Sequence, residues 1–421
     1  MHVLFVHENF PAQFGQVAVQ LARVPGNRCT FVSSRSPGPV PGIEHIQYKT
    51  AGGAQQSTHF CSRTFENQTW SSHALYEAMR QRPDIRPDLI VAHSGFVSSL
   101  FLRELYPQTP QIGYFEYFYR THDSDVDFRH DLQLLSDNEL LRCRARNAQL
   151  LLDLHNCDAG YTPTQFQRAQ LPQEYQPKVR QIFDGIDIGF WKQSALGSRT
   201  YQGITIPADS RMVTYVSRGF ESLRGFDIFL QAADRICRAR PDVHVVVVGE
   251  DRVCYGGDSK FIGQQTFKEW TINKYRPDLS RIHFVGRLPP DQLVNLFSIS
   301  DVHLYLTGPF VLSWSLMNAL SCSCVVLASD TAPVREVIQQ GQTGLLADFF
   351  DVEAFTETAL RVLKSPDEFR HLGIAGRQLI ESRYSLPDCL QQLQQLFRET
   401  VDRGTGDAAS SARLPANGPL A

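Results

Sequence analysis

The chain reads MVTYVSRGFESLRGFDIFLQAADRICRARPDVHVVVVG over residues 212–249, which predicts a strand, a helix and a second strand in succession. The two outer runs, 212–217 and 243–248, are mostly apolar and do not alternate between apolar and polar positions. This pattern is typical of strands that are covered on both faces, as in parallel sheets. Between them, apolar residues recur at helical spacing from Phe226 to Cys237. Such a unit, with its crossover helix, is the building block of a doubly wound α/β domain.

Similar β-rich runs recur along the whole chain and alternate with longer helical patterns. They cover residues 3–6, 29–33, 89–92, 111–115, 159–162, 179–182, 282–285, 302–306 and 325–328. The sequence therefore predicts the α/β class with two doubly wound, Rossmann-like domains. The predicted parts are an N-terminal domain at 1–188, a linker at 189–210, a C-terminal domain at 211–384, a helix at 385–402 and a tail at 403–421. Because the tail is small, polar and rich in Pro and Gly, we expect it to be disordered.

Length, composition and charge limit the function classes. The chain has 421 residues, of which 42% are apolar and 20% charged, so it can bury two cores and is neither disordered nor collagen-like. A formal net charge of −3 gives no case for general nucleic-acid binding. The nine cysteines include no C-x-x-C pair, which argues against a zinc site and for a reducing compartment. We expect a cytoplasmic protein without a targeting signal or membrane span, and peripheral membrane contact stays open.

Four segments follow one another in the second half: YVSRGFESLRGFDIFLQAA, VVVVGED, RIHFVGRLPPDQLVNLFSISDVHLYL and PFVLSWSLMNALSCSCVVLASD. In order, spacing and content they resemble the retaining glycosyltransferases of family four, the group-one nucleotide-sugar enzymes of the GT-B fold. The first half, from HENFPAQF through GYFEYFYR to RNAQLLLDLHNCDAGYTPTQFQ, resembles the N-terminal domain of a bacterial branch of that family.

The resemblance implies an acceptor-side domain and a nucleotide-sugar-binding domain that face each other across a cleft. It implies a metal-independent, retaining transfer of a sugar from a nucleotide diphosphate sugar to an unidentified glycan, lipid or protein acceptor. The nucleotide sugar is a co-substrate, and no other cofactor is implied. Two alternatives stay open. One is a non-catalytic GT-B subunit or scaffold of a glycosylation complex. The other is a hydrolysing epimerase, disfavoured because the acidic and histidine groups that it needs cannot be placed.

Two arginines follow the strand 212–217. Loops at the carboxyl ends of parallel strands carry ligand sites, and guanidinium groups there can neutralise a departing diphosphate. In the family a basic pair in this loop contacts the donor pyrophosphate, so the resemblance assigns a catalytic role to Arg218 and Arg224. The alternative is a solvated pair bonded to Glu221.

A helix is expected to open at Pro309 and Phe310. Its first N–H groups and its dipole form an anion site, to which Ser313 and Ser315 can add hydroxyl donors. The alternative is an ordinary capped helix with Pro near its start.

This helix departs from the common family pattern. Most relatives carry a Glu, seven residues and a second Glu that holds the donor ribose, and the corresponding positions here are Phe310 and Asn318. The closer branch accepts Phe at the first position but keeps Glu at the second. Asn accepts a hydrogen bond without the charge that strengthens it, so donor use is weakened or altered, or catalysis is lost.

The donor side is expected to include two more loops. In the family the backbone around Gly286, Arg287 and Leu288 binds the nucleobase, although G-R-L-P-P by itself is only a turn into a helix. Gly249 and Glu250, at the end of the strand 243–248, are assigned to the donor as well.

Three residues of the N-terminal half are site candidates. His93 ends the strand 89–92, and in several relatives a His of this loop lies near the reacting sugar, so it is taken as catalytic; the alternative is a His that only supports its neighbours. Glu116 lies among aromatic residues, a composition that suits sugar binding, and is assigned to the acceptor, unless those aromatics are mostly core. Glu8 either contacts the acceptor or caps local structure.

The run THDSDVDF contains Asp123, Asp125 and Asp127, a D-x-D pattern that invites a metal interpretation. Metal-dependent transferases use this motif at a strand end in a different fold. Here it falls in a long polar loop, so a solvated or acceptor-binding loop is favoured and no metal site is predicted.

Overall fold

The computed structural model describes residues 1–411 except 36–37, 133–134 and 196, and it divides into two compact units. Unit 1 contains Met1–Thr121, Leu135–Asp184 and the chain from Pro387 onward. Unit 2 contains Gly185–Leu386 and, in addition, the short segment that begins at His122. This segment falls inside the predicted N-terminal domain but packs with the residues of the C-terminal one.

Unit 1 is built on a seven-stranded parallel sheet with the order β3-β2-β1-β4-β5-β6-β7. The strands are β1 (His2–Val6), β2 (Arg28–Ser33), β3 (Ile43–Gln47), β4 (Leu89–Ser94), β5 (Gln111–Phe115), β6 (Ala159–Thr162) and β7 (Val179–Gln181). The helices are α1 (Gly15–Ala22), α2 (Arg63–Arg80), α3 (Asp137–Ala145), α4 (Ala148–Asn156), α5 (Gln165–Gln170) and α12 (Leu386–Ser411). All six predicted strands of this half are present. β3 was missed because this half-exposed edge strand reads Ile-Glu-His-Ile-Gln and lacks an apolar run.

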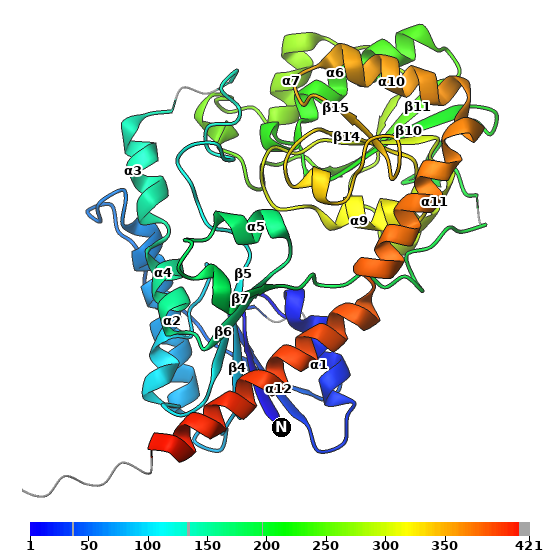
Figure 1. Ribbon diagram of the computed structural model, residues 1–421. Helices are drawn as coiled ribbons and strands as arrows, with labels where there is room; N and C mark the ends of the chain where they lie inside the picture. The colour runs from blue at the N-terminus through cyan, green and yellow to red at the C-terminus, as the bar shows by residue number, and fades with distance from the viewer. Residues whose placement is uncertain (36–37, 133–134, 196, 412–421) are drawn as a thin grey trace, which may run out of the picture. The chain divides into compact units, whose positions relative to one another are not determined.

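Helices cover both faces of this sheet (Figure 1). Leu4 of β1 packs with Leu75 of α2 on one face, whereas Phe5 points to the other face and meets Phe397 of α12 at a ring distance of 6.3 Å. The buried residues of α12 recur at helical spacing and hold it against unit 1. This helix runs to Ser411, past the point where the sequence predicts a disordered tail, and the remaining tail residues 412–421 lie outside the described part.

Unit 2 is built on a six-stranded parallel sheet with the order β12-β11-β10-β13-β14-β15. The strands are β10 (Arg211–Gly219), β11 (Val243–Glu250), β12 (Ile282–Phe284), β13 (Val302–Tyr305), β14 (Val326–Ser329) and β15 (Leu345–Ala347). The helices are α6 (Phe226–Ala239), α7 (Phe267–Tyr275), α8 (Pro290–Ile299), α9 (Trp314–Ser321), α10 (Val352–Lys364) and α11 (Pro366–Arg383). A two-stranded hairpin of β8 (Thr200–Tyr201) and β9 (Ile204–Thr205) lies in the predicted linker.

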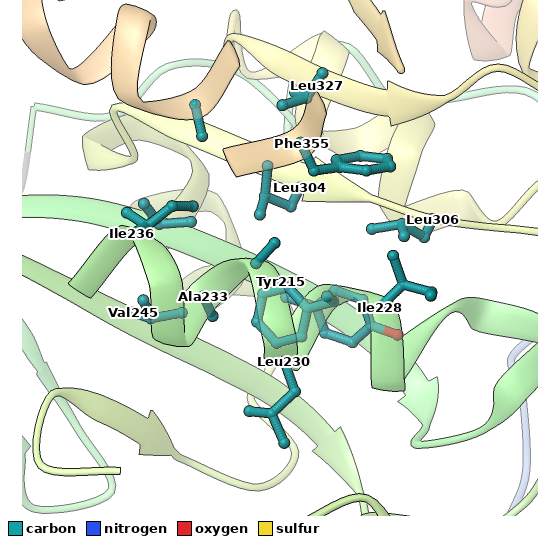
Figure 2. Packing of buried hydrophobic residues seen from close by; sticks show 14 of the residues in the cluster. Tyr215, Ile228, Leu230, Ala233, Ile236, Val245, Leu304, Leu306, Leu327 and Phe355 are labelled. Atoms are coloured by element: carbon teal, nitrogen blue, oxygen red, sulfur yellow. The ribbon is translucent and has the colours of Figure 1, made fainter. Parts of the chain in front are cut away.

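The predicted strand–helix–strand unit is confirmed as β10, α6 and β11, with β10 and β11 paired in parallel. Figure 2 shows the core between this unit and α10, where Ile236, Leu304 and Phe355 meet. Tyr215 stacks on Phe229 at 4.2 Å and donates its hydroxyl to the carbonyl of Arg224 at 2.9 Å. The core of unit 2 thus fixes the backbone of a predicted site residue directly.

Among the helices of the described chain, none is long and apolar enough to cross a membrane. The nine cysteines are all free thiols.

A buried carboxyl group in unit 1 generates a test of the packing. Asp153 of α4 accepts hydrogen bonds from Ser94, Ser98 and Gln149, and burial raises its pKa to about 6. Between the unfolded value near 3.8 and this value, the native state binds more protons than the unfolded state, so stability falls as the pH rises.

We therefore expect the Asp153→Asn variant to gain stability relative to the wild type between pH 4 and pH 7. At about 1.4 kcal/mol per pKa unit, the gain is at most about 3 kcal/mol. Urea unfolding of both proteins at several pH values measures it. A difference between the two proteins that stays constant over this range contradicts the burial argument.

Candidate functional site

The predicted arginine pair lies at the carboxyl end of β10. Arg218 is exposed and is the penultimate residue of the strand, whereas Arg224 is buried and ends the short 3-10 turn η4 (Ser222–Arg224). The Nη1 of Arg224 donates to Thr307 Oγ1 at 2.7 Å and to the carbonyl of Val311 at 3.1 Å. Within the described residues its Nη2 and Nε make no hydrogen bond, and no carboxylate pairs with it. A guanidinium fixed in this way keeps its charge and its remaining donors for a ligand.

Tyr255 connects the two arginines and is not among the site residues predicted from the sequence. Its hydroxyl accepts from Arg218 Nη1 at 3.2 Å, and its ring centre lies 5.3 Å from the Cζ of Arg224 and 5.4 Å from the ring of Phe310. The signal that could have found it is its position, five residues after the end of β11, the strand beside β10. Loops that follow neighbouring parallel strands meet at one edge of the sheet.

Glu221 holds the Tyr255 loop rather than the arginine pair. Its Oε2 accepts from the backbone N–H groups of Cys254, Tyr255 and Gly256, at 2.7, 2.7 and 3.0 Å. The alternative of an arginine pair bonded to Glu221 is therefore wrong.

The helix that was expected to open at Pro309 and Phe310 begins later in the chain. α9 starts at Trp314, and the side chain of Ser313 caps it by accepting from the N–H of Ser315 at 3.0 Å. Pro309 and Phe310 form a bend before the helix, and the side chain that caps the helix is that of Ser313. The prediction that the helix opens at Pro309 and Phe310 is wrong, while the placement of two serines at its start is confirmed.

Asn318 lies in the second turn of α9 and is buried. Its side chain makes no hydrogen bond in the described part of the chain. Its amide atoms are not among the fully buried polar atoms that lack a partner, so they are reachable by solvent or by a ligand hydroxyl.

The remaining donor candidates lie at the same edge of the sheet. The N–H of Gly249 donates to the carbonyl of Gly286 at 3.0 Å, which joins the ends of β11 and β12. Arg287 is exposed and Leu288 is buried. Glu250 forms an ion pair with Arg252 at 2.7 Å, and this bond, with smaller contributions from Arg287 and Arg218, lowers the pKa of its carboxyl.

In unit 1 the structure brings His93 and Glu116 together. His93 Nε2 lies 3.5 Å from Glu116 Oε2, and Gln13 donates to the other carboxylate oxygen at 3.4 Å. The ring of His7 lies 4.6 Å from that of His93, and burial, followed by the charge of His93, lowers the pKa of His7 to about 2. His7 and Gln13 were not predicted as site residues, although His7 follows β1, the neighbour of β4, just as His93 ends β4.

Two further candidates of unit 1 are Glu8 and Glu116. The backbone carbonyl of Glu8 accepts from the N–H groups of Ser34 and Arg35, and the assignment of its side chain to the acceptor stays a prediction. Tyr114 and Phe115 are buried core residues, and of the segment around them Glu116 keeps a partly exposed carboxylate.

The D-x-D run forms its own turn. Asp127 accepts from the backbone N–H groups of Asp123 and Ser124, both at 2.9 Å. Over the residues that the structure describes, no group of three or more His, Cys, Asp or Glu side chains could hold a metal ion.

Comparison with known families accounts for most of the chain. Residues 25–190 match the family model described as "Glycosyl transferase family 4 group", and residues 200–379 match "Glycosyl transferases group 1". The chain belongs to the group-one, family-four glycosyltransferases. The matched residues contain the arginine pair, α9 and the His93–Glu116 contact.

Solved structures confirm the GT-B fold of this family-four member. Sucrose-phosphate synthase from Thermosynechococcus elongatus superposes with a TM-score of 0.71 at 18% identity, covering 95% of this chain and 98% of that one. Anabaena Alr3699/HepE in complex with UDP and glucose superposes with a TM-score of 0.65 at 13% identity, covering 95% and 100%.

Curated relatives of the chain are distant. The D-inositol 3-phosphate glycosyltransferase of Corynebacterium urealyticum is 24% identical over 198 residues, 47% of this chain and 45% of the relative. The alpha-maltose-1-phosphate synthase of Mycolicibacterium smegmatis is 24% identical over 232 residues, 53% and 57%. The matches thus span about half the length of these curated relatives.

Proposed function

We propose that the protein is a retaining, metal-independent glycosyltransferase that moves a sugar from a nucleoside diphosphate sugar to a glycan, lipid or protein acceptor. The observation that carries this proposal is the buried guanidinium of Arg224. It is held by neutral oxygens, lacks a carboxylate partner among the described residues, and has Nη2 and Nε unbonded there. A buried cation without a counter-ion is costly, and an anionic ligand removes that cost.

The chemistry assigned to this site is stabilisation of a leaving group. When the bond between the sugar and the diphosphate breaks, negative charge grows on the phosphate oxygens, and Arg218 and Arg224 stabilise it. The N-terminal end of α9 adds N–H dipoles, with the hydroxyls of Ser313 and Ser315 beside it. In the retaining mechanism that the family implies, the departing diphosphate itself helps to deprotonate the acceptor.

The donor and the acceptor are assigned to different parts of the chain. Anabaena HepE has been solved with UDP-glucose, which makes this nucleotide sugar the first donor to test here. The His93–Glu116 pair supplies polar groups of the kind that bind sugar hydroxyls, and we assign it to the reacting sugar or the acceptor. Its position at the carboxyl end of β4 supports this assignment.

A second candidate function rests on Asn318. Without the carboxylate that most relatives carry there, the chain fits a non-catalytic subunit that supports a partner transferase. Release of nucleoside diphosphate from the donor separates the two candidates, because a scaffold releases none. The identity of the product sugar distinguishes a transferase from an epimerase.

The experiment that tests the proposal is a thermal-shift panel of UDP, GDP and ADP, their free nucleosides and their common sugar conjugates. A ligand that binds the folded state raises the unfolding midpoint as its concentration exceeds the dissociation constant. We expect at least one nucleoside diphosphate and its sugar conjugate to raise the midpoint. If none of them does so, the proposed function is wrong.

The arginine pair predicts selectivity for phosphate. We expect Arg224→Ala, and to a lesser degree Arg218→Ala, to weaken nucleoside diphosphate binding much more than binding of the free nucleoside. At about 1.5–3 kcal/mol for a hydrogen bond to a charged group, the loss is about tenfold or more. Calorimetric titration measures both ligands, with Arg335→Ala, an exposed arginine paired with Asp330 in the same unit, as the control. An equal loss for both ligands points to misfolding or a misplaced site.

Metal independence predicts that activity survives chelation. We expect transfer or donor hydrolysis to continue in EDTA, because guanidinium groups and a helix N-terminus replace the ion. Loss of activity in EDTA with rescue by Mn²⁺ or Mg²⁺ would restore the metal interpretation of Asp125 and Asp127.

The side-chain amide of Asn318, which has no hydrogen bond within the described chain, predicts that a carboxylate at this position improves donor binding. A charge-assisted hydrogen bond exceeds a neutral one by about 1 kcal/mol, so Asn318→Glu is expected to tighten donor binding modestly. Donor affinity and hydrolysis of the two proteins are measured side by side. A tenfold weaker donor affinity in the variant would show that Asn318 does not correspond to the second Glu of the family. A variant with unchanged donor affinity and no hydrolysis would favour the scaffold.

A further inference from the structure

One segment of unit 2 comes from the middle of the other unit's sequence. Residues 122–132, called the arm below, lie between β5 and α3 in the chain, and both of these elements belong to unit 1. The contacts of the arm place it in unit 2, where it packs beside η4 and the start of α6.

Arg129 anchors the arm with all five of its N–H donors. Nη1 donates to the carbonyl of Ser222 at 2.7 Å and to Asp227 Oδ1 at 2.9 Å, and Nη2 donates to Asp227 Oδ2 at 2.7 Å. Nε and Nη2 donate to the two oxygens of Asp131, both at 2.8 Å. The side chain of Arg129 is 4% exposed and that of Asp227 is 1% exposed. This saturation fixes the guanidinium, and through it the Ser222 carbonyl, in one position.

Phe128 supplies the apolar part of the same anchor. Its ring lies 4.8 Å from that of Phe349, in a T-shaped arrangement. A Cβ added to Gly308 would lie 2.9 Å from Phe128 Cδ1 and 2.8 Å from Leu223 Cδ1, so the glycine is enclosed between the arm and η4. The N–H of Gly308 also donates to the carbonyl of Leu223 at 2.8 Å.

These contacts reach both segments that support Arg224. Ser222 and Leu223 precede Arg224 within η4, and Thr307 and Val311, which accept from Arg224, flank Gly308. Within unit 2, the arm therefore holds the backbone on either side of the Arg224 guanidinium but does not touch it.

We propose that Arg129 is a positioning residue for the diphosphate site. By fixing the Ser222 carbonyl, with Phe128 against Gly308, the arm holds η4 and residues 307–311 so that the unbonded donors of Arg224 stay oriented for phosphate. This inference rests on the proposed function, because it concerns the same donor site. It goes further in stating that a segment between β5 and α3 controls the affinity for the diphosphate and not for the nucleoside.

The test separates this role from mere support of the fold. The variant Arg129→Met/Asp227→Asn removes the two most buried charges together and leaves only the carboxylate of Asp131, whose side chain is 35% exposed, without its arginine. Arg129→Lys keeps the charge but cannot make five hydrogen bonds. The matched control is Arg377→Met/Glu381→Gln. Arg377 is another largely buried arginine of unit 2, which binds the carbonyls of Trp191, Ser321 and Ile188 away from η4.

Two measurements are made on each full-length variant at a temperature where it is folded. The first is the calorimetric affinity for the nucleoside diphosphate that stabilises the wild type and for its free nucleoside. The second is hydrogen exchange of the backbone amides of residues 222–225 and of Gly308, Phe310 and Val311. We expect the Arg129/Asp227 variant to lose at least tenfold in diphosphate affinity, to keep nucleoside affinity within about twofold, and to exchange faster at these amides alone. Arg129→Lys should show a diphosphate affinity and an exchange rate between those of the double variant and the wild type. The control variant should change neither the diphosphate affinity nor the exchange rate.

Parallel loss of both affinities, or unchanged diphosphate affinity and unchanged exchange, overturns the proposal. If the double variant does not fold, Arg129→Lys decides by the same two measurements. If the wild type binds no nucleoside diphosphate, the proposed function fails by itself. The exchange measurement then still decides whether Arg129 orders η4. Exchange in the Arg129 variants that is as slow as in the wild type would overturn this ordering role independently of the proposed function.

Discussion

The buried guanidinium of Arg224 is the group around which the proposed donor site is arranged. Taking a cation out of water costs several kcal/mol unless other groups solvate it, and a carboxylate would do so while cancelling its charge. Here the protein uses the hydroxyl of Thr307 and the carbonyl of Val311 instead. Neutral oxygens hold the side chain in place and leave its positive charge uncompensated, which is the state in which it can bind an anion.

Acidic residues around Arg224 are present but are occupied elsewhere. Glu221 accepts from three backbone N–H groups of the Tyr255 loop, Asp258 from the N–H and hydroxyl of Ser222, and Asp227 from Arg129. Each carboxylate thus fixes a neighbouring segment by accepting hydrogen bonds from it. The geometry of the site is set by buried negative charge, while the groups left for a ligand are Arg218, Tyr255 and the remaining donors of Arg224. A site built in this way is preorganised for charge that appears on a ligand.

The sequence predicts the fold well because the dominant signal is local. Each predicted apolar run forms a strand, and the strands not predicted are the half-exposed β3, the short β15 and the two-residue strands β8 and β9. The strand ends predict Arg218, Arg224 and His93 as site residues, and their roles stay predictions. Tyr255, His7 and Arg129 depend on pairings between residues distant in the chain: Tyr255 on Glu221, and Arg129 on Asp227, 98 positions away. The start of α9 was misplaced because Pro309 resembles a first helical residue, whereas the hydroxyl of Ser313 provides the cap.

The two units differ in the charge of the side chains at the ends of their strands. In unit 2 the guanidinium groups of Arg218 and Arg224 lie near the sheet edge, and no carboxylate among the described residues forms an ion pair with either of them. In unit 1 burial keeps His7 neutral at physiological pH, since its pKa is lowered to about 2, and the His93–Glu116 contact is the polar feature beside it. Diphosphate is common to all donors of this class and needs a fixed positive site, whereas acceptors differ and need hydrogen-bonding groups on a scaffold that tolerates variation. In the proposed function, the guanidinium groups of unit 2 meet the first requirement, and the His93–Glu116 contact beside the neutral His7 meets the second.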